Sequence, residues 1–528
     1  MADELTRVTE ESARGGFFLI SGTAIATVIM AVASILIARF LGPELYGQYT
    51  LALVVPQLLF LFTDLGINQG ITKFTASFRV KNETMRIRRV IKYGLMLRAF
   101  TGIAIFAINY ALADSFASIL LQRPDLAFYI RIASISVLFQ VIFTTATSAF
   151  VGLDKTEYNA LTANIHAIAK AIISIALVLL GFSVAGAIIG HVASYIVAAI
   201  ASVSFLFLTI REKQVNQDNH SVSDDFKTLV HYGAPLYISL LLTGFIPLYQ
   251  NVILAIFTTD ADIGNYKAAT NFIALMAILA VPITTALLPA FSKLNSSTNQ
   301  KIKTFYKLAN KYTAMIIIPI TFLLIIFSKE IVQIIYGYTY QSAPLFLTTY
   351  CLLYFLVGLG YLVLPSLYNG LGETKTTLKM SLITFLMLAF LSPIFTKTYS
   401  VQGLIVAFLI ASTVGTTYGL YIARKKFQIE FDTNILFRIY LNSAISSILP
   451  LLILHFTQLP KILNITIGGL LYLFIYATIT PLTKTVTLSE LQTATHVTEK
   501  IRPLAFIIKP VLTYQQRLLH NKANPQNF

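Results

Sequence analysis

The sequence has little charge, no tryptophan and almost no cysteine. Of its 528 residues, 12% are charged, about half the usual share of a soluble protein, and 56% are hydrophobic. Soluble domains of ordinary size cannot bury that much apolar surface, so lipid must be the solvent for most of it. Cys351 is the only cysteine, which excludes a disulfide scaffold.

Motifs of nucleotide hydrolysis and of common hydrolases are also missing. The chain contains no G-x-x-x-x-G-K-[ST] phosphate loop, no H-E-x-x-H and no G-x-S-x-G. No polar segment is long enough for a separate catalytic domain. We therefore expect that the protein is not an enzyme and that it needs no cofactor and no metal. The net charge of +16 indicates cytoplasmic loops that face anionic lipid, and we expect no nucleic acid partner.

Apolar segments long enough to cross a bilayer recur along the chain. A transmembrane helix needs about 20 apolar residues, and these runs are too long and too uniform for barrel strands. We expect fourteen spans, at 17–40, 48–72, 93–120, 127–152, 160–181, 184–210, 229–257, 264–290, 312–336, 343–369, 376–395, 401–423, 434–456 and 462–483. The predicted fold class is an all-α polytopic membrane protein.

Lysine and arginine are unevenly distributed between the two sides of this topology. With the N-terminus inside, the inner loops and tails hold 30 of them, and the outer loops hold four, namely Arg123, Lys329, Lys397 and Lys461. Cytoplasmic loops carry an excess of basic residues. The distribution predicts a multi-pass plasma membrane protein with both termini in the cytoplasm.

The chain also repeats itself at a fixed distance. Ala38, Phe40, Gly47, Tyr49 and Ala52 recur 217 residues later, and Ser183-Val184-x-Gly186 recurs as Ser400-Val401-x-Gly403. A repeat of six spans gives two parallel copies related by an axis along the membrane normal, around a central cavity. The expected organisation is an amphipathic N-terminal segment (1–16), an N-lobe (17–210), a cytoplasmic linker (211–228), a C-lobe (229–423), two extra spans (434–483) and a cytoplasmic tail with an interfacial helix (484–528).

Three motifs carry a resemblance to a known family. They are Ala38–Tyr49 (ARFLGPELYGQY) followed by Asp64-Leu65-Gly66, the loop Gly152–Lys155 (GLDK), and Tyr368–Lys375 (YNGLGETK). The sequence resembles the polysaccharide-export branch, the Wzx-type oligosaccharide flippases, of the multidrug/oligosaccharidyl-lipid/polysaccharide (MOP) exporter superfamily. The resemblance implies that superfamily's fold and the transfer of lipid-linked oligosaccharide from the cytoplasmic to the outer leaflet.

Ionisable residues within spans are costly and are therefore candidate site residues. Lys170 lies ten residues into its span, too deep to reach a headgroup region easily, and His166 and Ser174 continue its helical face. Lys170 and His166 are predicted to contact substrate, with a buried network between helices as the alternative. Lys267 and Asn271, one turn apart, are predicted to face them from the second lobe.

Arg39, Arg98 and Arg131 complete the set of predicted substrate-binding residues. For these arginines and for Lys267 the alternative is that the long side chain extends to the headgroups. Asp64 is the deepest carboxylate and is the candidate for ion coupling. It could equally cap the broken backbone at Leu65-Gly66, or pair with Arg98 or Lys170.

A cavity with five basic residues and one deep acid suits an anionic cargo. We expect a flippase for polyprenyl-phosphate-linked or polyprenyl-pyrophosphate-linked oligosaccharide that works by alternating access. The expected partners are that lipid, the membrane, and glycosyltransferases or a polymerase of the same pathway, with the protein itself a monomer. The rivals are a multidrug or cation-coupled exporter, a membrane glycosyltransferase or polymerase, and a non-transporting scaffold of the same fold.

Overall fold

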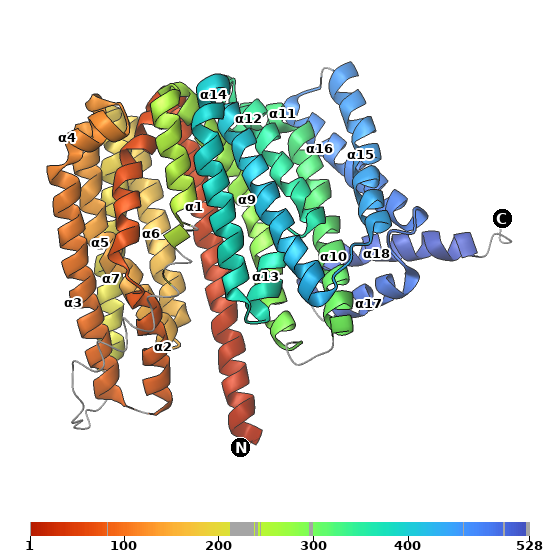
Figure 1. Cartoon of the computed structure of the whole chain (residues 1–528), viewed down its shortest axis with the longest axis horizontal. Helices are drawn as coiled ribbons and strands as arrows, with labels where there is room; N and C mark the ends of the chain where they lie inside the picture. Colours follow the sequence, from red (N-terminus) through yellow and green to blue (C-terminus); the bar gives the residue numbers. More distant parts are fainter. Residues whose placement is uncertain are drawn as a thin grey trace. The chain divides into compact units, whose positions relative to one another are not determined.

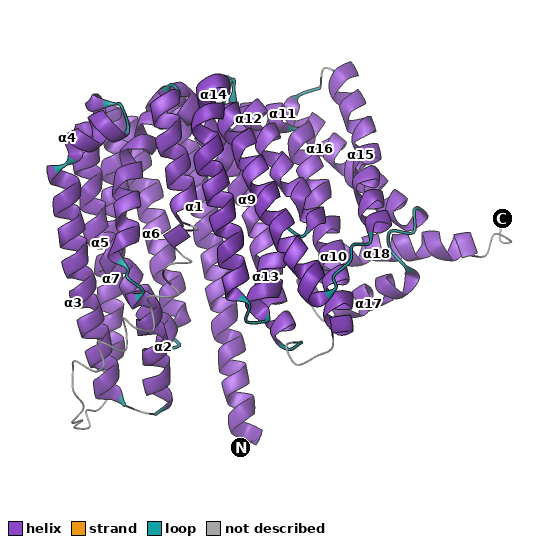
Figure 2. Cartoon of the chain, viewed as in Figure 1, coloured by secondary structure: helices purple, strands orange, loops and turns teal. Residues whose placement is uncertain are grey.

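The computed structural model describes residues 2–81, 83–211, 237, 241, 242, 244–294, 299–457, 459–499 and 502–523. All regular secondary structure in these ranges is helical (Figure 2). The α-helices, labelled in Figure 1, are α1 (Ala2–Phe60), α2 (Ile67–Val80), α3 (Thr84–Ala111), α4 (Ala113–Ser115), α5 (Ala127–Gly152), α6 (Thr156–Leu177), α7 (Ser183–Arg211), α9 (Asp260–Ser292), α10 (Asn299–Ile326), α11 (Ser328–Ile335), α12 (Ala343–Cys351), α13 (Val363–Gly370), α14 (Thr374–Phe427), α15 (Thr433–Phe456), α16 (Lys461–Leu482), α17 (Leu488–Glu499) and α18 (Arg502–Ala523).

The chain divides into two compact units. Unit 1 comprises 1–271, 336–342 and 385–407, and unit 2 comprises 272–335, 343–384 and 408–528. These bounds overlap with the two predicted lobes without coinciding with them, so the lobe boundaries stay a prediction. Of the predicted linker (211–228), only Arg211 lies within the described residues. The predicted N-terminal segment belongs to α1, which is helical from Ala2 onward.

Eight helices in the described ranges are long and apolar enough to cross a membrane, or ten if two bent pairs each count as one span. Three of the eight have 43, 55 and 54 residues (21–63, 156–210 and 374–427). A straight helix of 54 residues would measure about 80 Å, far more than the hydrocarbon core of about 30 Å. Each is interrupted by non-helical backbone, at Gly42, Ser183 and Ser400. We therefore interpret each as two consecutive spans, and the total of fourteen stays a prediction.

The repeat in the sequence has a counterpart in the geometry of unit 1. Gly47 of α1 lies so close to Asp260 that a Cβ atom on it would stand 1.9 Å from the carbonyl oxygen of Asp260. A Cβ atom on Gly264 of α9 would stand 1.8 Å from the carbonyl oxygen of Pro43. Pro43 and Asp260 are separated by the same 217 residues as Gly47 and Gly264. Such a reciprocal contact is what a two-fold relation between the copies requires.

A second pair of repeat positions shares an unusual backbone conformation. Ser183 has φ 51° and ψ −131°, and Ser400 has φ 53° and ψ −141°. A positive φ is uncommon for a residue with a side chain. Its recurrence at equivalent positions indicates that both copies turn between consecutive spans in the same way.

The C-terminal region packs within unit 2. Helix α15 contacts α10 and α16, and α18 contacts α16 and α17. Gln515 of α18 donates to the carbonyl oxygen of Ala477 on α16 at 2.9 Å. The predicted interfacial helix corresponds to α18, although the side chains of its first turns lie outside the described residues.

Candidate functional site

Unit 1 contains two groups of polar residues that ordinary helix packing does not account for. The first, which we call the lysine–histidine cluster, consists of His166, Lys170, His191, Tyr195 and Lys267. It is built from α6, α7 and α9, and it contains the predicted pair His166 and Lys170 and one member, Lys267, of the predicted pair Lys267 and Asn271.

Lys170 lies on the face of α6 that is covered by the protein, and only 8% of it is exposed. Its ammonium group is close enough to Lys267 of α9 for the two positive charges to repel each other. The ammonium groups of both lysines lack a hydrogen bond or an ion pair with any described residue. A buried ammonium without an opposite charge is costly, so this position requires water or an anionic ligand.

Two histidines surround Lys170. The ring of His166 lies 4.4 Å from that of Tyr195, and the ring of His191 meets Tyr195 edge-on at 5.1 Å. The Nε2 atom of His166 and both ring nitrogens of His191 are buried and have no hydrogen-bond partner among the described residues. Buried polar groups are normally satisfied, so unpartnered groups gathered around one cation indicate a place for ligand or water.

Tyrosines extend the cluster toward the C-terminal part of α1. Asn271 donates to the hydroxyl groups of Tyr46 at 3.0 Å and Tyr336 at 3.2 Å, and Tyr46 stacks on Tyr49. The hydroxyl of Tyr49 is buried without a partner among the described residues. Asn271 therefore connects two tyrosines one helical turn from Lys267.

Two other polar residues on the same face of α6, Asn159 and Ser174, have packing roles. Asn159 donates to the carbonyl oxygen of Thr147 on α5, and Ser174 donates to that of Ala187 on α7. Ser174 is fully buried, and Gly190 of α7 approaches it closely. Asn159 and Ser174, at the two ends of this face, thus belong to a hydrogen-bond network between helices, which was the alternative. The side chains of His166 and Lys170, at its centre, form no such bonds with described residues.

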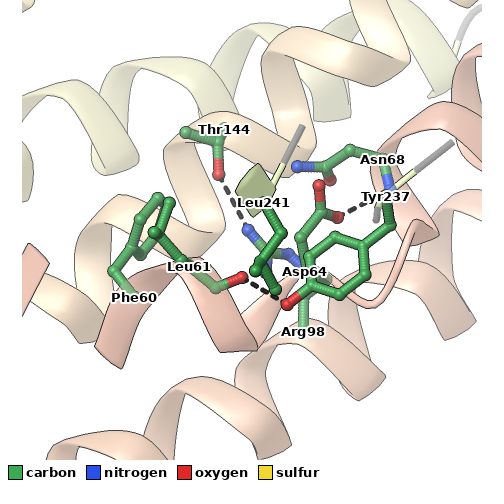
Figure 3. A pocket seen from close by; sticks show the side chains of 8 residues that line it. All are labelled: Phe60, Leu61, Asp64, Asn68, Arg98, Thr144, Tyr237 and Leu241. Carbon is green, nitrogen blue, oxygen red and sulfur yellow. Dashed lines mark hydrogen bonds between the residues drawn. The ribbon is translucent and has the colours of Figure 1, made fainter. Parts of the chain in front are cut away.

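The second group lines a pocket of about 140 Å³, which we call the Arg98 pocket (Figure 3). Its lining residues are Phe60, Leu61, Asp64, Asn68, Arg98, Thr144, Tyr237 and Leu241. Arg98 is 1% exposed, so it does not extend to the headgroup region. Its guanidinium donates to the hydroxyl groups of Thr63, Thr144 and Thr145.

Asp64 lies at the break between α1 and α2. Its Oδ1 atom accepts the backbone N–H of Asn68 at 3.0 Å, in the first turn of α2. Leu65 and Gly66 have positive φ angles of 49° and 82°, which is the broken backbone that the sequence suggested. Asp64 therefore has a capping role, and it forms no ion pair with Arg98 or Lys170 within the described ranges, although its charge acts on Arg98. Ion coupling by Asp64 stays a prediction.

The remaining predicted site residues lie elsewhere. Arg39 is exposed on α1. Arg131 of α5 is half-buried and pairs with the carboxylate of Asp114. The structure thus divides the predicted set into the lysine–histidine cluster, the Arg98 pocket and two separate arginines, and their roles toward substrate stay predictions.

Sequence reasoning missed His191 and the tyrosines. His191 was not among the predicted site residues, since nothing in its local sequence distinguishes it. Tyr46 and Tyr336 are 290 residues apart, and no local signal connects them. The repeat gave one signal for a tyrosine, because Tyr49 recurs 217 residues later as Tyr266. The Tyr266 hydroxyl donates to Gln250 at 3.3 Å.

Comparisons with known proteins agree with this architecture. The family described as polysaccharide biosynthesis protein matches residues 12–295, which is more than half of the chain. A comparison with curated protein sequences gives no match.

Several solved structures share the fold. A structure of the lipid II flippase MurJ in an inward closed conformation matches at a TM-score of 0.70 and 19% identity, over 88% of this chain and 99% of that chain. An inward-facing multidrug resistance MATE transporter of the MOP superfamily matches at a TM-score of 0.64 and 17% identity, over 78% of this chain and 98% of that chain. A MOP superfamily transporter from Pyrococcus furiosus, with a binding pocket of reverse polarity, matches at a TM-score of 0.55 and 17% identity, over 79% of this chain and 95% of that chain. The chain is a member of the polysaccharide biosynthesis protein family with the fold of the MOP transporter superfamily, as the sequence motifs predicted.

Proposed function

We propose that the protein is a flippase that moves a polyprenyl-phosphate-linked or polyprenyl-pyrophosphate-linked oligosaccharide from the cytoplasmic to the outer leaflet of the plasma membrane. The observation that carries the proposal is the pair Lys170, which is buried, and Lys267, which is half-buried; their positive charges repel each other, and neither has an acidic partner in the described part of the chain. An anion with several acceptor oxygens, such as a pyrophosphate, would satisfy both lysines at once.

The family and the fold support this proposal from another direction. The family matched is named for polysaccharide biosynthesis, and MurJ is named as a flippase of lipid II. Solved MATE transporters of the same fold occur in inward-facing and outward-facing conformations. Alternating access is therefore the mechanism that we propose here. On this basis the protein is a transporter and not an enzyme.

Each member of the lysine–histidine cluster has a distinct proposed role. Lys170 supplies a flexible point charge that can follow a phosphate group as the protein changes conformation. Lys267 supplies the second charge, and His166 and His191 offer N–H donors from unpartnered ring nitrogens. Asn271 is a positioning residue, because it bonds two tyrosines and holds them beside Lys267.

The alternative is a multidrug exporter, which the MATE structures make a real candidate because they have the same fold. A site for organic cations needs carboxylates or other negative charge. The lysine–histidine cluster instead holds two lysines and two histidines, and no carboxylate contacts either lysine within the described ranges. This charge favours an anionic cargo.

The proposal is tested by Lys170→Gln in the full-length protein reconstituted in liposomes. The substitution keeps the length and polarity of the side chain and removes its charge. Transfer of a polyprenyl-pyrophosphate-linked oligosaccharide, detected through a fluorophore on the sugar that an impermeant reagent quenches in the outer leaflet, should fall by at least about tenfold, the effect of losing one charge-assisted hydrogen bond. Lys397→Gln, which alters an exposed lysine of the same unit, is the matched control and should transfer lipid normally.

Two results would contradict the proposal. One is normal transfer by Lys170→Gln together with loss only in Lys170→Leu, because this would assign Lys170 to helix packing. The other is a wild-type protein that exports a cationic dye from the same vesicles and leaves the pyrophosphate lipid in place. Protein abundance and monodispersity are measured for every variant, so that misfolding is not mistaken for loss of transport.

A further inference from the structure

The Arg98 pocket is separate in its contacts from the lysine–histidine cluster, and its chemistry is different. Arg98, a residue that is 1% exposed, forms one wall of it (Figure 3). Its volume of about 140 Å³ is an order of magnitude above the 10–15 Å³ that one water molecule requires. The polar groups in the wall therefore indicate what kind of molecule would fill it.

Hydrogen-bond donors of the pocket remain unused. A guanidinium has five N–H groups, and Arg98 uses one from each nitrogen, toward Thr63, Thr144 and Thr145. Two N–H groups are left without an acceptor in the described part of the chain. All three acceptors are neutral hydroxyl groups, so the positive charge of Arg98 is not matched by a direct ion pair.

Acceptors of the pocket are unused as well. The Oδ1 atom of Asp64 accepts the backbone N–H of Asn68, while its Oδ2 atom has no partner among the described residues. The Oδ1 atom of Asn68 is buried and has no donor there. The Tyr237 hydroxyl donates to the carbonyl oxygen of Leu61 at 2.8 Å, which leaves its oxygen able to accept.

This combination selects against simple ions. A phosphate or sulfate would satisfy Arg98, but it would bring negative charge toward Asp64 and give nothing to Asn68 Oδ1. A metal cation would satisfy Asp64 and be repelled by Arg98. Hydroxyl groups donate and accept at once, so a neutral ring with several hydroxyls can satisfy both kinds of group. The faces of Phe60 and Leu241 provide the apolar surface that the C–H side of such a ring needs.

We propose that the Arg98 pocket binds one uncharged sugar residue through hydrogen bonds to Arg98, Asp64 and Asn68. The inference deepens the proposed flippase function and rests on it, because the sugar would belong to the oligosaccharide whose lipid phosphate contacts the lysine–histidine cluster. It gives the protein a site for selecting a sugar that is distinct from the site for the phosphate.

The absence of tryptophan allows a direct binding test. Phe60→Trp places a single tryptophan in the wall of the pocket. The full-length variant in detergent is titrated with lipid-free methyl glycosides of neutral hexoses, 6-deoxyhexoses and N-acetylhexosamines, and also with inorganic phosphate and sodium chloride. At least one neutral glycoside should change the tryptophan fluorescence saturably. Phe207→Trp, on an exposed position of α7, is the control and should show no saturable change.

Two further substitutions in the Phe60→Trp background locate the effect. Asp64→Asn keeps the capping of α2, since Asn caps as well as Asp, but weakens the acceptor for the sugar. Asn68→Ala removes the unpartnered acceptor. Asp64→Asn should raise the Kd of the responding glycoside by about tenfold, the effect of losing one charge-assisted hydrogen bond, and Asn68→Ala by a smaller factor.

The outcomes separate this proposal from the flippase function. Saturable binding by phosphate or sodium without binding of any glycoside would overturn the sugar pocket. Two other results would overturn the sugar pocket if transfer of the pyrophosphate lipid remains intact. One is the absence of a saturable response to every glycoside, and the other is a glycoside response that both substitutions leave unchanged. A saturable glycoside response in a protein that transfers no lipid would support the pocket and contradict the flippase function alone.

Discussion

Glu490 connects the C-terminal region to the membrane-spanning part of unit 2. Its carboxylate accepts two hydrogen bonds from Lys311 of α10, at 2.7 Å to Oε1 and 2.9 Å to Oε2. It also accepts the backbone N–H of Thr487 at 2.9 Å, while the Thr487 hydroxyl accepts the backbone N–H of Glu490 at 3.4 Å. This reciprocal pair is a capping box at the N-terminus of α17. The Glu490 side chain therefore caps the N-terminus of α17 and binds it to α10.

The cost of losing Glu490 follows from these contacts. The side chain of Lys311 is 9% exposed and that of Glu490 is 19% exposed. Removing one partner of a buried ion pair costs about 3–5 kcal/mol. In Glu490→Gln the amide still accepts a bond from Lys311 and still completes the capping box, so we expect a loss of about 2 kcal/mol. Glu490→Ala also loses the cap, which adds about 1 kcal/mol.

The single cysteine provides the assay. Cys351 of α12 lies in the same unit and is fully buried, so a thiol-reactive dye reports the opening of unit 2. When reclosing is faster than labelling, the labelling rate follows the equilibrium constant for opening. A loss of 2 kcal/mol should raise the rate by about 30-fold for Glu490→Gln. Glu373→Gln is the control, because its pair with Lys426 is exposed and such pairs contribute little.

The same assay has a defined pH dependence. Burial alone would raise the pKa of Glu490, but the hydrogen bonds from Lys311 and Thr487 and the charge of Lys311 outweigh it, so its pKa lies below the ordinary value. A carboxyl with a lowered folded-state pKa stabilises the protein above its unfolded-state pKa, and the effect disappears as the pH falls through the folded-state value. The difference between wild type and Glu490→Gln should be constant near neutral pH and shrink only in acid. Equal labelling rates of the two proteins at pH 7 would refute the argument.

The sequence predicted the parts of the fold that have a periodic or repeated signal. The apolar runs predicted an all-helical membrane protein, and the 217-residue repeat predicted equivalence between positions such as Ser183 and Ser400, which share a positive φ. A break in the backbone at Leu65-Gly66 was one alternative within the predicted span 48–72, and α1 and α2 are separated there. The number of spans is harder to establish, because a turn with only one or two non-helical residues is short compared with the helices that it joins.

The candidate site was only partly predictable, because depth in a span does not determine which side chains meet. Lys170 and Lys267 were both visible as intramembrane cations, and the positive charge of Lys267 acts on Lys170. Arg98 looked able to reach the headgroups by its position six residues from the predicted end of its span, yet three threonine hydroxyls hold it inside. Those threonines come from α5 and from the short turn after α1, and only the tertiary fold brings them to one guanidinium.

Two further predictions follow from topology and from the repeat. In a background without Cys351, cysteines at positions 80 and 300 should be protected from an impermeant thiol reagent in intact cells, and cysteines at 45 and 398 should react; labelling at 80 or 300 would reverse the predicted orientation. The second concerns Gly264, whose added Cβ atom would stand 1.8 Å from the carbonyl oxygen of Pro43. Because a backbone carbonyl cannot move without its helix, Gly264→Ala should destabilise the protein by about 1–3 kcal/mol. Gly469→Ala on α16 is the matched control, since nothing lies within 4 Å of its Cβ position and alanine favours helix there. Thermal unfolding followed by circular dichroism should place Gly264→Ala below wild type and Gly469→Ala at or above it. A Gly264→Ala protein as stable as wild type would mean that α1 and α9 do not make the reciprocal contact that relates the two copies of the repeat.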